Sequence, residues 1–160
     1  MTDAGRPLSH LDAGGHAHMV DVSGKDVTAR EASASGRVLL SPAAVAALRA
    51  GEVPKGDALA VARIAGIQAA KRTPDLVPLC HPIAIHSVSV ELDVTSDGVT
   101  ITATVRTADR TGVEMEALTS VTVAALALID MVKAIDPAAV ISDVRVESKA
   151  GGKTGSWRRP

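Results

Sequence analysis

The amino-acid sequence predicts an α+β fold in which helices pack on one face of an antiparallel sheet. Apolar and polar residues alternate strictly over residues 87–105 with a break at Ser96-Asp97-Gly98, which is typical of a β-hairpin. Two longer segments, residues 57–72 and 114–135, place apolar residues three or four apart, which is typical of amphipathic helices. The chain therefore combines adjacent antiparallel strands with helices that cover them.

The N-terminal region is predicted to add a strand pair to this core. Residues 1–15 are rich in Gly, Asp, His and Ser and show little periodicity, so we expect a flexible N-terminal arm. Residues 19–23 and 28–40 look extended and are separated by a turn near Ser23-Gly24-Lys25. These two segments are expected to pair.

Helix signals are clear after residue 40. Ser41 offers a capping hydroxyl, Pro42 suits the first helical position, and Gly51 ends the helix. The longer helix over residues 57–72 begins at an aspartate and ends before Pro74. Both helices precede the predicted hairpin.

The C-terminal half completes the predicted topology. Asp136-Pro137 stops the long helix over residues 114–135, and residues 139–147 are predicted to form a strand. The order β-β-α-α-β-β-α-β is close to a ferredoxin-like core with the N-terminal strand pair and first helix added. We find no repeat or linker, so we expect one catalytic domain over residues 16–155 and a C-terminal tail over residues 156–160.

Composition excludes several classes of function. The chain has no Phe, no Tyr and one Trp, so it lacks the rings on which RNA- and oligonucleotide-binding folds stack bases. Its formal net charge is −1, without the basic bias that attracts a polyanion nonspecifically. Cys80 is the only cysteine, which excludes an internal disulfide and favours a reducing cytoplasm. No run approaches the roughly 20 apolar residues that cross a bilayer, so we expect a soluble protein without membrane or nucleic-acid partners.

The polar chemistry lies in a few short motifs at the ends of apolar elements. They are Pro54-Lys55-Gly56-Asp57, Leu79-Cys80-His81-Pro82, Gly112-Val113-Glu114-Met115-Glu116, Asp130-Met131-Val132-Lys133 and Lys149-Ala150-Gly151-Gly152-Lys153-Thr154-Gly155. Lysines, a histidine and carboxylates in such places are what an anionic substrate and proton transfer require. We therefore expect the functional site at these motifs.

His81 is the first candidate for proton transfer. Pro82 disfavours a helical conformation at His81, so the imidazole is expected on an extended or turn segment. His81 either exchanges protons with substrate or is an ordinary loop histidine beside a small core residue, Cys80, and the motif alone leaves both open. A zinc site that adds His16 and His18 is a weaker alternative, because paired spacings such as C-x-x-C are absent.

Asp130 and Lys133 lie three residues apart near the end of the long predicted helix, so they are neighbours on one surface. An exposed ion pair is the ordinary interpretation of such spacing. The apolar residues around the pair instead favour a largely buried helix, where partial desolvation would tune the pKa values of both groups.

Residues 149–155 resemble a phosphate cradle, because glycines expose backbone N–H groups and lysines supply charge. The segment is not a Walker A loop, since Glu147 stands where that motif requires the first glycine. It is either a disordered basic tail or a loop that orders over a phosphate. Lys55, just before a helix start, could meet a phosphate with help from the helix dipole.

These motifs, in this order and spacing, closely resemble those of the cyclic pyranopterin monophosphate synthase family of molybdenum-cofactor biosynthesis. The resemblance extends to residues 19–23, 62–73 and 112–119. Members of that family take the 3′,8-cyclised dihydroguanosine triphosphate from a partner radical enzyme. They rearrange it to a pterin, expel pyrophosphate and close a cyclic phosphate. The resemblance covers residues 19 to 155.

The resemblance also implies roles for individual residues. Asp130 is the expected catalytic acid or base, with Lys133 beside it. The residues expected to line the substrate pocket are Leu79, Cys80, His81, Met115 and Glu116. Lys55 and Lys149 are expected near the triphosphate and the reacting centre, with Lys153 assisting. No cofactor or protein-bound metal is implied; whether Mg²⁺ accompanies the substrate triphosphate stays open.

Three positions depart from the family pattern. Ile129 stands where we would expect Tyr, and Ala150 and Thr154 occupy places often held by Ser. Loss of the Tyr hydroxyl would alter hydrogen bonding around the site, while Asp130 and Lys133 are both present. We expect activity to be adjusted rather than lost.

Helix geometry separates two of the expected site residues. Glu116 and Asp130 are fourteen residues apart, which is about 21 Å along a helix at 1.5 Å per residue. That distance is long for one nucleotide, so we expect each pocket to combine Glu116 from one subunit with Asp130 and Lys133 from another. The family's usual hexamer, a trimer of dimers, would fit.

Two other classes of function stay open. A regulatory module on the same scaffold would bind the triphosphate without turnover. A catalytically silent oligomerisation scaffold would leave the polar motifs scattered and exposed.

Overall fold

The computed structural model describes residues 9–160, so residues 1–8 of the predicted N-terminal arm lie outside the described part of the chain. Five antiparallel strands form one sheet in the order β2-β3-β1-β4-β5. They are β1 (Thr28–Leu39), β2 (Ser87–Thr95), β3 (Gly98–Asp109), β4 (Val140–Ala150) and β5 (Trp157–Arg158). The helices are α1 (Pro42–Ala50), α2 (Ala58–Lys71), α3 (Thr73–Leu76) and α4 (Glu114–Val132).

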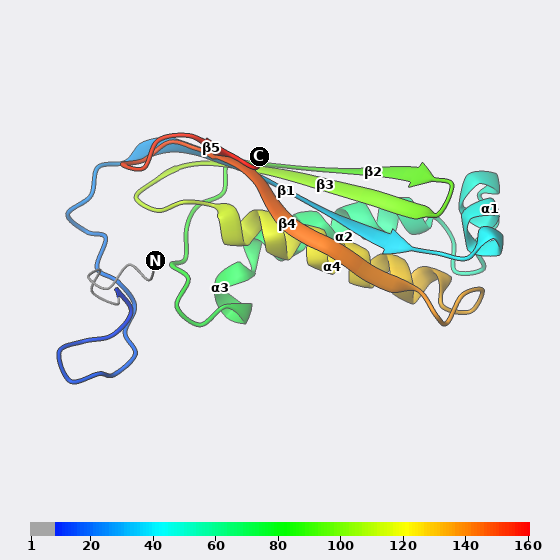
Figure 1. Cartoon of the computed structure of the whole chain (residues 1–160), viewed down its shortest axis with the longest axis horizontal. Coiled ribbons are helices and arrows are strands. Elements are labelled where there is room, and N and C mark those ends of the chain that lie inside the picture. The colour runs from blue at the N-terminus through cyan, green and yellow to red at the C-terminus, as the bar shows by residue number, and fades with distance from the viewer. Residues whose placement is uncertain (1–8) are drawn as a thin grey trace.

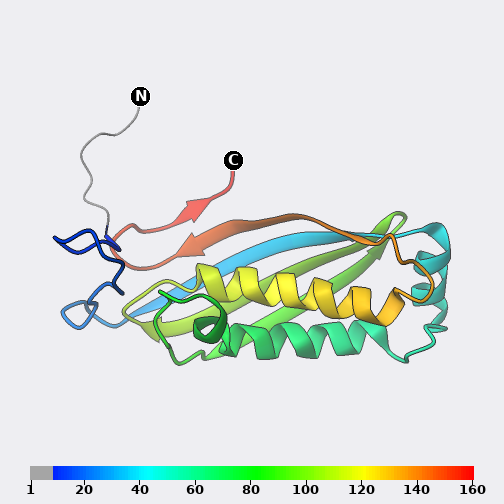
Figure 2. The same ribbon diagram turned by 90° about the horizontal axis from the view of Figure 1, so that it is seen from below.

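The helices cover one face of the sheet. Helices α2 and α4 lie side by side beneath it, and α1 sits at one end (Figures 1 and 2). Together, β1, α2, β2, β3, α4 and β4 form the predicted ferredoxin-like arrangement, which is confirmed. The hairpin is confirmed as well, since Val94 pairs with Val99 and Thr95 with Gly98.

The N-terminal strand pair is only half correct. Residues 28–39 form β1, but residues 19–23 form no strand and lead into a turn in which the Lys25 N–H donates to the Val22 carbonyl at 3.0 Å. The reason is that β1 already has β3 on one side and β4 on the other, so it has no free edge for another strand. An isolated antiparallel bridge between Leu11 and Ala17 precedes this turn.

Local capping fixes the helix starts as predicted. The Ser41 hydroxyl accepts from the Ala44 N–H at 3.3 Å, and Gly51 ends α1 with φ of 70°. The Asp57 carboxylate accepts from the Ala60 N–H at 3.0 Å at the start of α2. Two boundaries differ: Pro74 lies inside the short helix α3, and α4 ends at Val132, three residues before the predicted stop.

Small residues allow α2 and α4 to pack closely. A Cβ atom on Gly66 of α2 would lie 3.0 Å from the Ser120 carbonyl oxygen of α4, so this position has little room for a side chain. The buried core is aliphatic and includes Ile101, Leu128 and Val121, all fully buried. Helix α4 therefore packs closely against both α2 and the sheet.

Helix α4 is also apolar and long enough to cross a membrane, by length and composition alone. Its apolarity comes from the same Ala, Val and Leu residues that face the core, and half of it is buried inside the protein. The expectation that no apolar run approaches the length needed to cross a bilayer therefore underestimated the length and apolarity of α4. Its burial makes it the core helix of this fold.

Candidate active site

The predicted site residues fall into two groups at opposite ends of α4. The residues near the N-terminal end of α4 are Leu79, Cys80, His81, Met115, Glu116, Lys149 and Lys153. The residues at its C-terminal end are Lys55, Asp130 and Lys133. Within one chain these groups do not form one cleft, in line with the separation expected from helix geometry.

Lys149 and Lys153 line a second cavity, described below, and the other five residues of the N-terminal group line a pocket of about 450 Å³. Its lining is Ser9, His10, Val20, Val22, Lys25, Leu79, Cys80, His81, Thr111, Gly112, Glu114, Met115 and Glu116. All five residues predicted to line a substrate pocket are therefore brought together. They come from the loop before β2 and from the first turn of α4.

Glu116 is the most perturbed acid of this pocket. Its side chain points from the first turn of α4 into the protein, and the residue is only 3% exposed. Burial, and to a smaller extent the nearby charge of Glu114, raises the pKa of Glu116 from 4.5 to about 7. The partial burial of Cys80, and then the nearby charge of Glu116, raises the pKa of the Cys80 thiol. Glu116 can therefore hold or release a proton near neutral pH.

His81 is oriented by the N-terminal segment. Its Nε2 lies 2.5 Å from the Val20 carbonyl oxygen. Because a carbonyl only accepts, Nε2 carries the hydrogen, and in the neutral ring Nδ1 is the nitrogen that remains to accept a proton. The segment over residues 19–23, although not a strand, thus fixes the tautomer of a pocket residue.

A smaller cavity of about 190 Å³ adjoins this pocket and shares Lys25, Thr111, Gly112 and Glu114 with it. Five cationic residues line the smaller cavity, namely Lys25, Arg30, Arg110, Lys149 and Lys153, with the carboxylates of Glu31 and Glu114. This excess of positive charge suits a polyanionic group. The pocket that contains Glu116 thus adjoins a cationic compartment.

Lys149 is held by two groups at the edge of this compartment. Its Nζ lies 3.3 Å from a Glu114 carboxylate oxygen and donates to the Thr154 hydroxyl at 3.3 Å. Thr154 therefore supplies the hydroxyl expected from Ser at that position. The lysine–glycine loop, residues 149–155, is not a free tail, because β5 follows it and pairs with β4.

The sequence did not single out Lys25, Arg30 or Arg110 as parts of this site, and Glu114 lay in an expected motif without a role of its own. Two local signals were present: Lys25 lies in the predicted turn after residue 22, and Arg110 lies two residues before the motif that contains Glu116. Arg30 lay in a predicted strand, where nothing local distinguished it. Its contribution follows from the packing of β1 beside the lysine–glycine loop.

The second group is an ion-paired triad around Asp130. Asp130 Oδ1 lies 2.7 Å from Lys133 Nζ, and its Oδ2 lies 3.0 Å from Lys55 Nζ. The hydrogen bond from Lys133, followed by that from Lys55, lowers the pKa of Asp130 below 3.8. Asp130 is therefore an ionised carboxylate at neutral pH.

The expected desolvation of Asp130 is wrong for the single chain. The Asp130 side chain is 56% exposed, because the outer face of the last turn of α4 is turned away from the sheet. Its pKa is set by the two lysines and not by burial. Ile129, at the position where Tyr was expected, packs instead against the core.

The zinc alternative finds no support in the geometry. Within residues 9–160, no three His, Cys, Asp or Glu side chains are placed together to hold a metal ion. Cys80 and His81 are therefore not joined by His16 and His18 in a ligand set.

Fold and site together define an α+β protein with a polyanion compartment beside a titratable pocket. Comparison with known proteins is more specific: the chain belongs to the MoaC family, whose model matches residues 19–152. It is 65% identical to the cyclic pyranopterin monophosphate synthase of Nocardioides sp., over the full length of both chains. It is 68% identical to the Streptomyces coelicolor protein of that name, over 95% of this chain and 89% of the relative. Identity to cyclic pyranopterin monophosphate synthase 2 of Mycobacterium tuberculosis is 57%, over 95% of this chain and 91% of the relative.

Proposed function

We propose that this chain is a lyase that converts (8S)-3′,8-cyclo-7,8-dihydroguanosine 5′-triphosphate to cyclic pyranopterin monophosphate and releases pyrophosphate. The observation that carries the proposal is the 65% identity, over both full lengths, to a protein named for that product. This reaction is an early step of molybdenum-cofactor biosynthesis. The chemistry of both residue groups at α4 supports it.

The cationic compartment suits the triphosphate. Pyrophosphate leaves as a polyanion, so cations that neutralise charge as it departs stabilise the transition state more than the ground state. Lys149 and Lys153 are assigned to this role together with Lys25, Arg30 and Arg110, which line the same cavity. The triphosphate end of the substrate therefore lies near the lysine–glycine loop.

The adjoining pocket suits ring rearrangement, which moves protons on and off nitrogen and carbon. Glu116, with its pKa raised to about 7, and His81, with Nδ1 left to accept, are the groups that can exchange protons there. Leu79, Cys80 and Met115 shape the walls around the base. Asp130 and Lys133 act as the main acid–base pair, with Lys55 holding the carboxylate ionised.

We propose that the complete site forms between subunits. The two groups are about 21 Å apart along α4, so one nucleotide meets both only if a second copy brings its Asp130 beside the first copy's Glu116. A homohexamer built as a trimer of dimers is the assembly we propose. In it, the exposed Asp130 triad would be covered by the neighbouring subunit.

Mixing two inactive variants tests the shared site. Glu116→Ala and Asp130→Ala proteins, dissociated and reassembled together, should recover part of the wild-type activity because some interfaces then carry one intact site. Each variant taken through the same cycle alone is the control. Mixtures no more active than the single variants would contradict sharing.

The reaction itself is tested by incubation with the cyclised triphosphate and an assay of pyrophosphate release. Wild type should release pyrophosphate and Lys133→Ala should not, whereas Lys71→Ala, at the exposed end of α2, should match wild type. Substrate that binds without any release would favour a regulatory module instead. The protein is proposed to need no cofactor of its own and to act in the cytoplasm, and adding EDTA to the assay asks whether Mg²⁺ accompanies the triphosphate.

A further inference from the structure

The lysine–glycine loop is closed by the last residues of the chain. After Gly155 the backbone returns beside β4, so that Trp157 pairs with Lys149 and Arg158 pairs with Ser148. Residues 151–156 are thus the connection of a short β-hairpin whose strands are β4 and β5. The conformation of this connection depends on whether β5 stays on the edge of β4.

Arg159 fastens β5 to that edge. Its backbone N–H donates to the Glu147 carbonyl at 2.8 Å, and its side-chain Nε donates to the Val146 carbonyl at 2.8 Å. The same Nε lies 3.7 Å from the Glu147 carboxylate, and the guanidinium lies 5.6 Å from the centre of the Trp157 ring. One side chain therefore contacts both strands of the hairpin.

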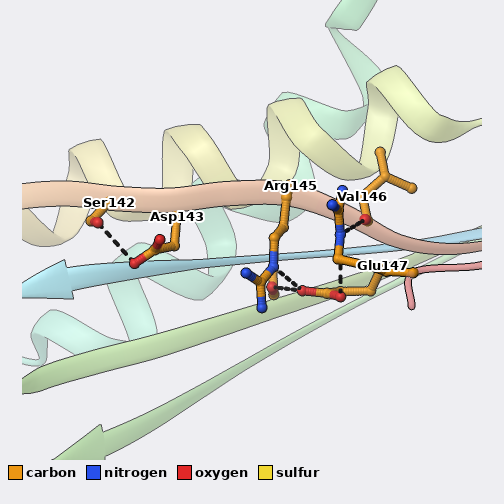
Figure 3. A network of polar contacts seen from close by, with 7 residues as sticks. Ser142, Asp143, Arg145, Val146 and Glu147 are labelled. Carbon is orange, nitrogen blue, oxygen red and sulfur yellow. Dashed lines mark hydrogen bonds and ion pairs between the residues drawn. The ribbon is translucent and has the colours of Figure 1, made fainter.

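Glu147 is itself held in place. Its carboxylate accepts from Arg145 Nε at 2.7 Å (Figure 3). It also accepts from the Ser35 hydroxyl of β1. These contacts lower the pKa of Glu147, so the carboxylate facing Arg159 stays ionised. The partner of Arg159 is thus anchored to the neighbouring central strand.

The loop is also seated on the start of β1. A Cβ atom on Gly151 would lie 2.2 Å from the Ala29 carbonyl oxygen, and one on Gly152 would lie 2.3 Å from an Arg30 guanidinium nitrogen. Both glycines have positive φ, 93° and 77°, which other residues rarely adopt. The backbone of the loop therefore lies directly against a strand that lines the cationic compartment.

We propose that Arg159 is a positioning residue, which holds β5 on β4 and thereby fixes Lys149 and Lys153 at the cationic compartment. The inference rests on the proposed function only for the identity of the polyanion. Lysines on a loose loop must be ordered when the anion binds, at a cost in affinity, whereas lysines on a closed hairpin are ordered beforehand. Arg159 contributes through the loop and does not touch the substrate.

The test uses the single tryptophan, in a chain that contains no tyrosine. Three variants of the full chain are compared: Arg159→Ala, Arg159→Lys and Arg158→Ala. The last is the matched control, because it removes the same charge from the neighbouring residue, whose side chain makes no hydrogen bond or ion pair with residues 9–160. The readouts are acrylamide quenching of Trp157, affinity for inorganic pyrophosphate, and KM and kcat with the cyclised triphosphate.

Arg159→Ala should increase the quenching of Trp157, weaken pyrophosphate binding about fivefold and raise KM about as much, with kcat within about twofold of wild type, since only preorganisation is lost. Arg159→Lys should show smaller changes than Arg159→Ala in all three readouts, and Arg158→Ala should behave as wild type. Equal effects of Arg158→Ala and Arg159→Ala would overturn the proposal, as would unchanged pyrophosphate affinity in Arg159→Ala. Pyrophosphate binding that depends on Arg159 without turnover by wild type would leave this inference standing and sink the proposed reaction.

Discussion

The two ends of α4 place carboxyl groups in opposite environments. Glu116, in the first turn, is buried in a pocket, and its pKa is raised to about 7. Asp130, in the last turn, is exposed between two lysines, and its pKa is lowered. Two acids on one helix thus differ in protonation at neutral pH. Environments that shift the pKa values of two carboxyl groups in opposite directions allow one to act as an acid and the other as a base.

The difference has a structural cause. The first turn of α4 lies under the loop that carries Leu79 and His81, so Glu116 is enclosed on several sides. At the last turn, Asp130 is exposed and pairs with Lys55, which precedes α2, and with Lys133, so its pKa is set by charge pairing and not by burial. Assembly with another copy would change the second environment far more than the first.

The largest effect is expected from Asp130→Asn. Because Asp130 is the assigned acid–base residue, its loss should lower kcat by about 1000-fold, within the usual range for such groups. Because Asn keeps the shape of the Asp side chain, we expect little change in the melting temperature. Pyrophosphate release and thermal unfolding are measured beside Asp93→Asn, an exposed aspartate on β2 that should be silent. A comparable loss in Asp93→Asn would show that charge alone matters.

Glu116→Gln should follow, with about a 100-fold loss in kcat/KM. It should also remove the limb of the pH–rate profile near pH 7, because the amide cannot titrate. The same substitution at exposed Glu52 serves as the control. A limb near pH 7 that persists in Glu116→Gln would show that Glu116 is not the group that titrates there.

Glu116 also makes stability depend on pH. Its folded pKa of about 7 exceeds the ordinary 4.5, so below pH 4.5 the group is protonated in both states and costs nothing. Between pH 4.5 and 7 the folded state binds more protons than the unfolded state, so this contribution to stability falls as pH rises. We expect the free energy of unfolding of Glu116→Gln, relative to that of wild type, to be about 2 kcal/mol higher at pH 8 than at pH 5. Urea unfolding at the two pH values measures this difference. A constant difference between the two proteins would contradict the burial of the charge.

Much of this organisation was predictable because it is local. Alternation gave the hairpin, capping residues gave α1 and α2, and helix rise gave the separation of Glu116 from Asp130. The pKa of Glu116 was not predictable, since burial depends on a distant loop that packs over α4. The role of β5 was not predictable either, because a strand of two residues shows no periodicity. Strand β5 is held by the contact of Arg159 with Glu147 across the hairpin, which the local sequence does not reveal.

Lys55→Ala tests the exposed end more finely and should have a smaller effect. Asp130 keeps Lys133, whose hydrogen bond is the larger cause of its lowered pKa. The pKa of Asp130 should therefore rise less in Lys55→Ala than in Lys133→Ala, and activity should fall by about tenfold, as for loss of one charge-assisted hydrogen bond. NMR titration of the Asp130 carboxyl carbon gives the order of the two variants directly. The reverse order would mean that Lys55 dominates the triad.

The smallest effect is expected at the buried end, from Thr154→Val. The substitution keeps the shape of the side chain but removes the hydroxyl that accepts from Lys149, while the Glu114 carboxylate at 3.3 Å still holds the ammonium group. Lys149 then loses one of its two contacts, an exposed hydrogen bond, and this loss should raise KM by about threefold and leave kcat unchanged. Thr154→Ser retains the hydroxyl and should match wild type. Equal KM values for Val and Ser would mean that Glu114 alone orients Lys149, so that the hydroxyl at residue 154 is not needed to hold the lysine at the cationic compartment.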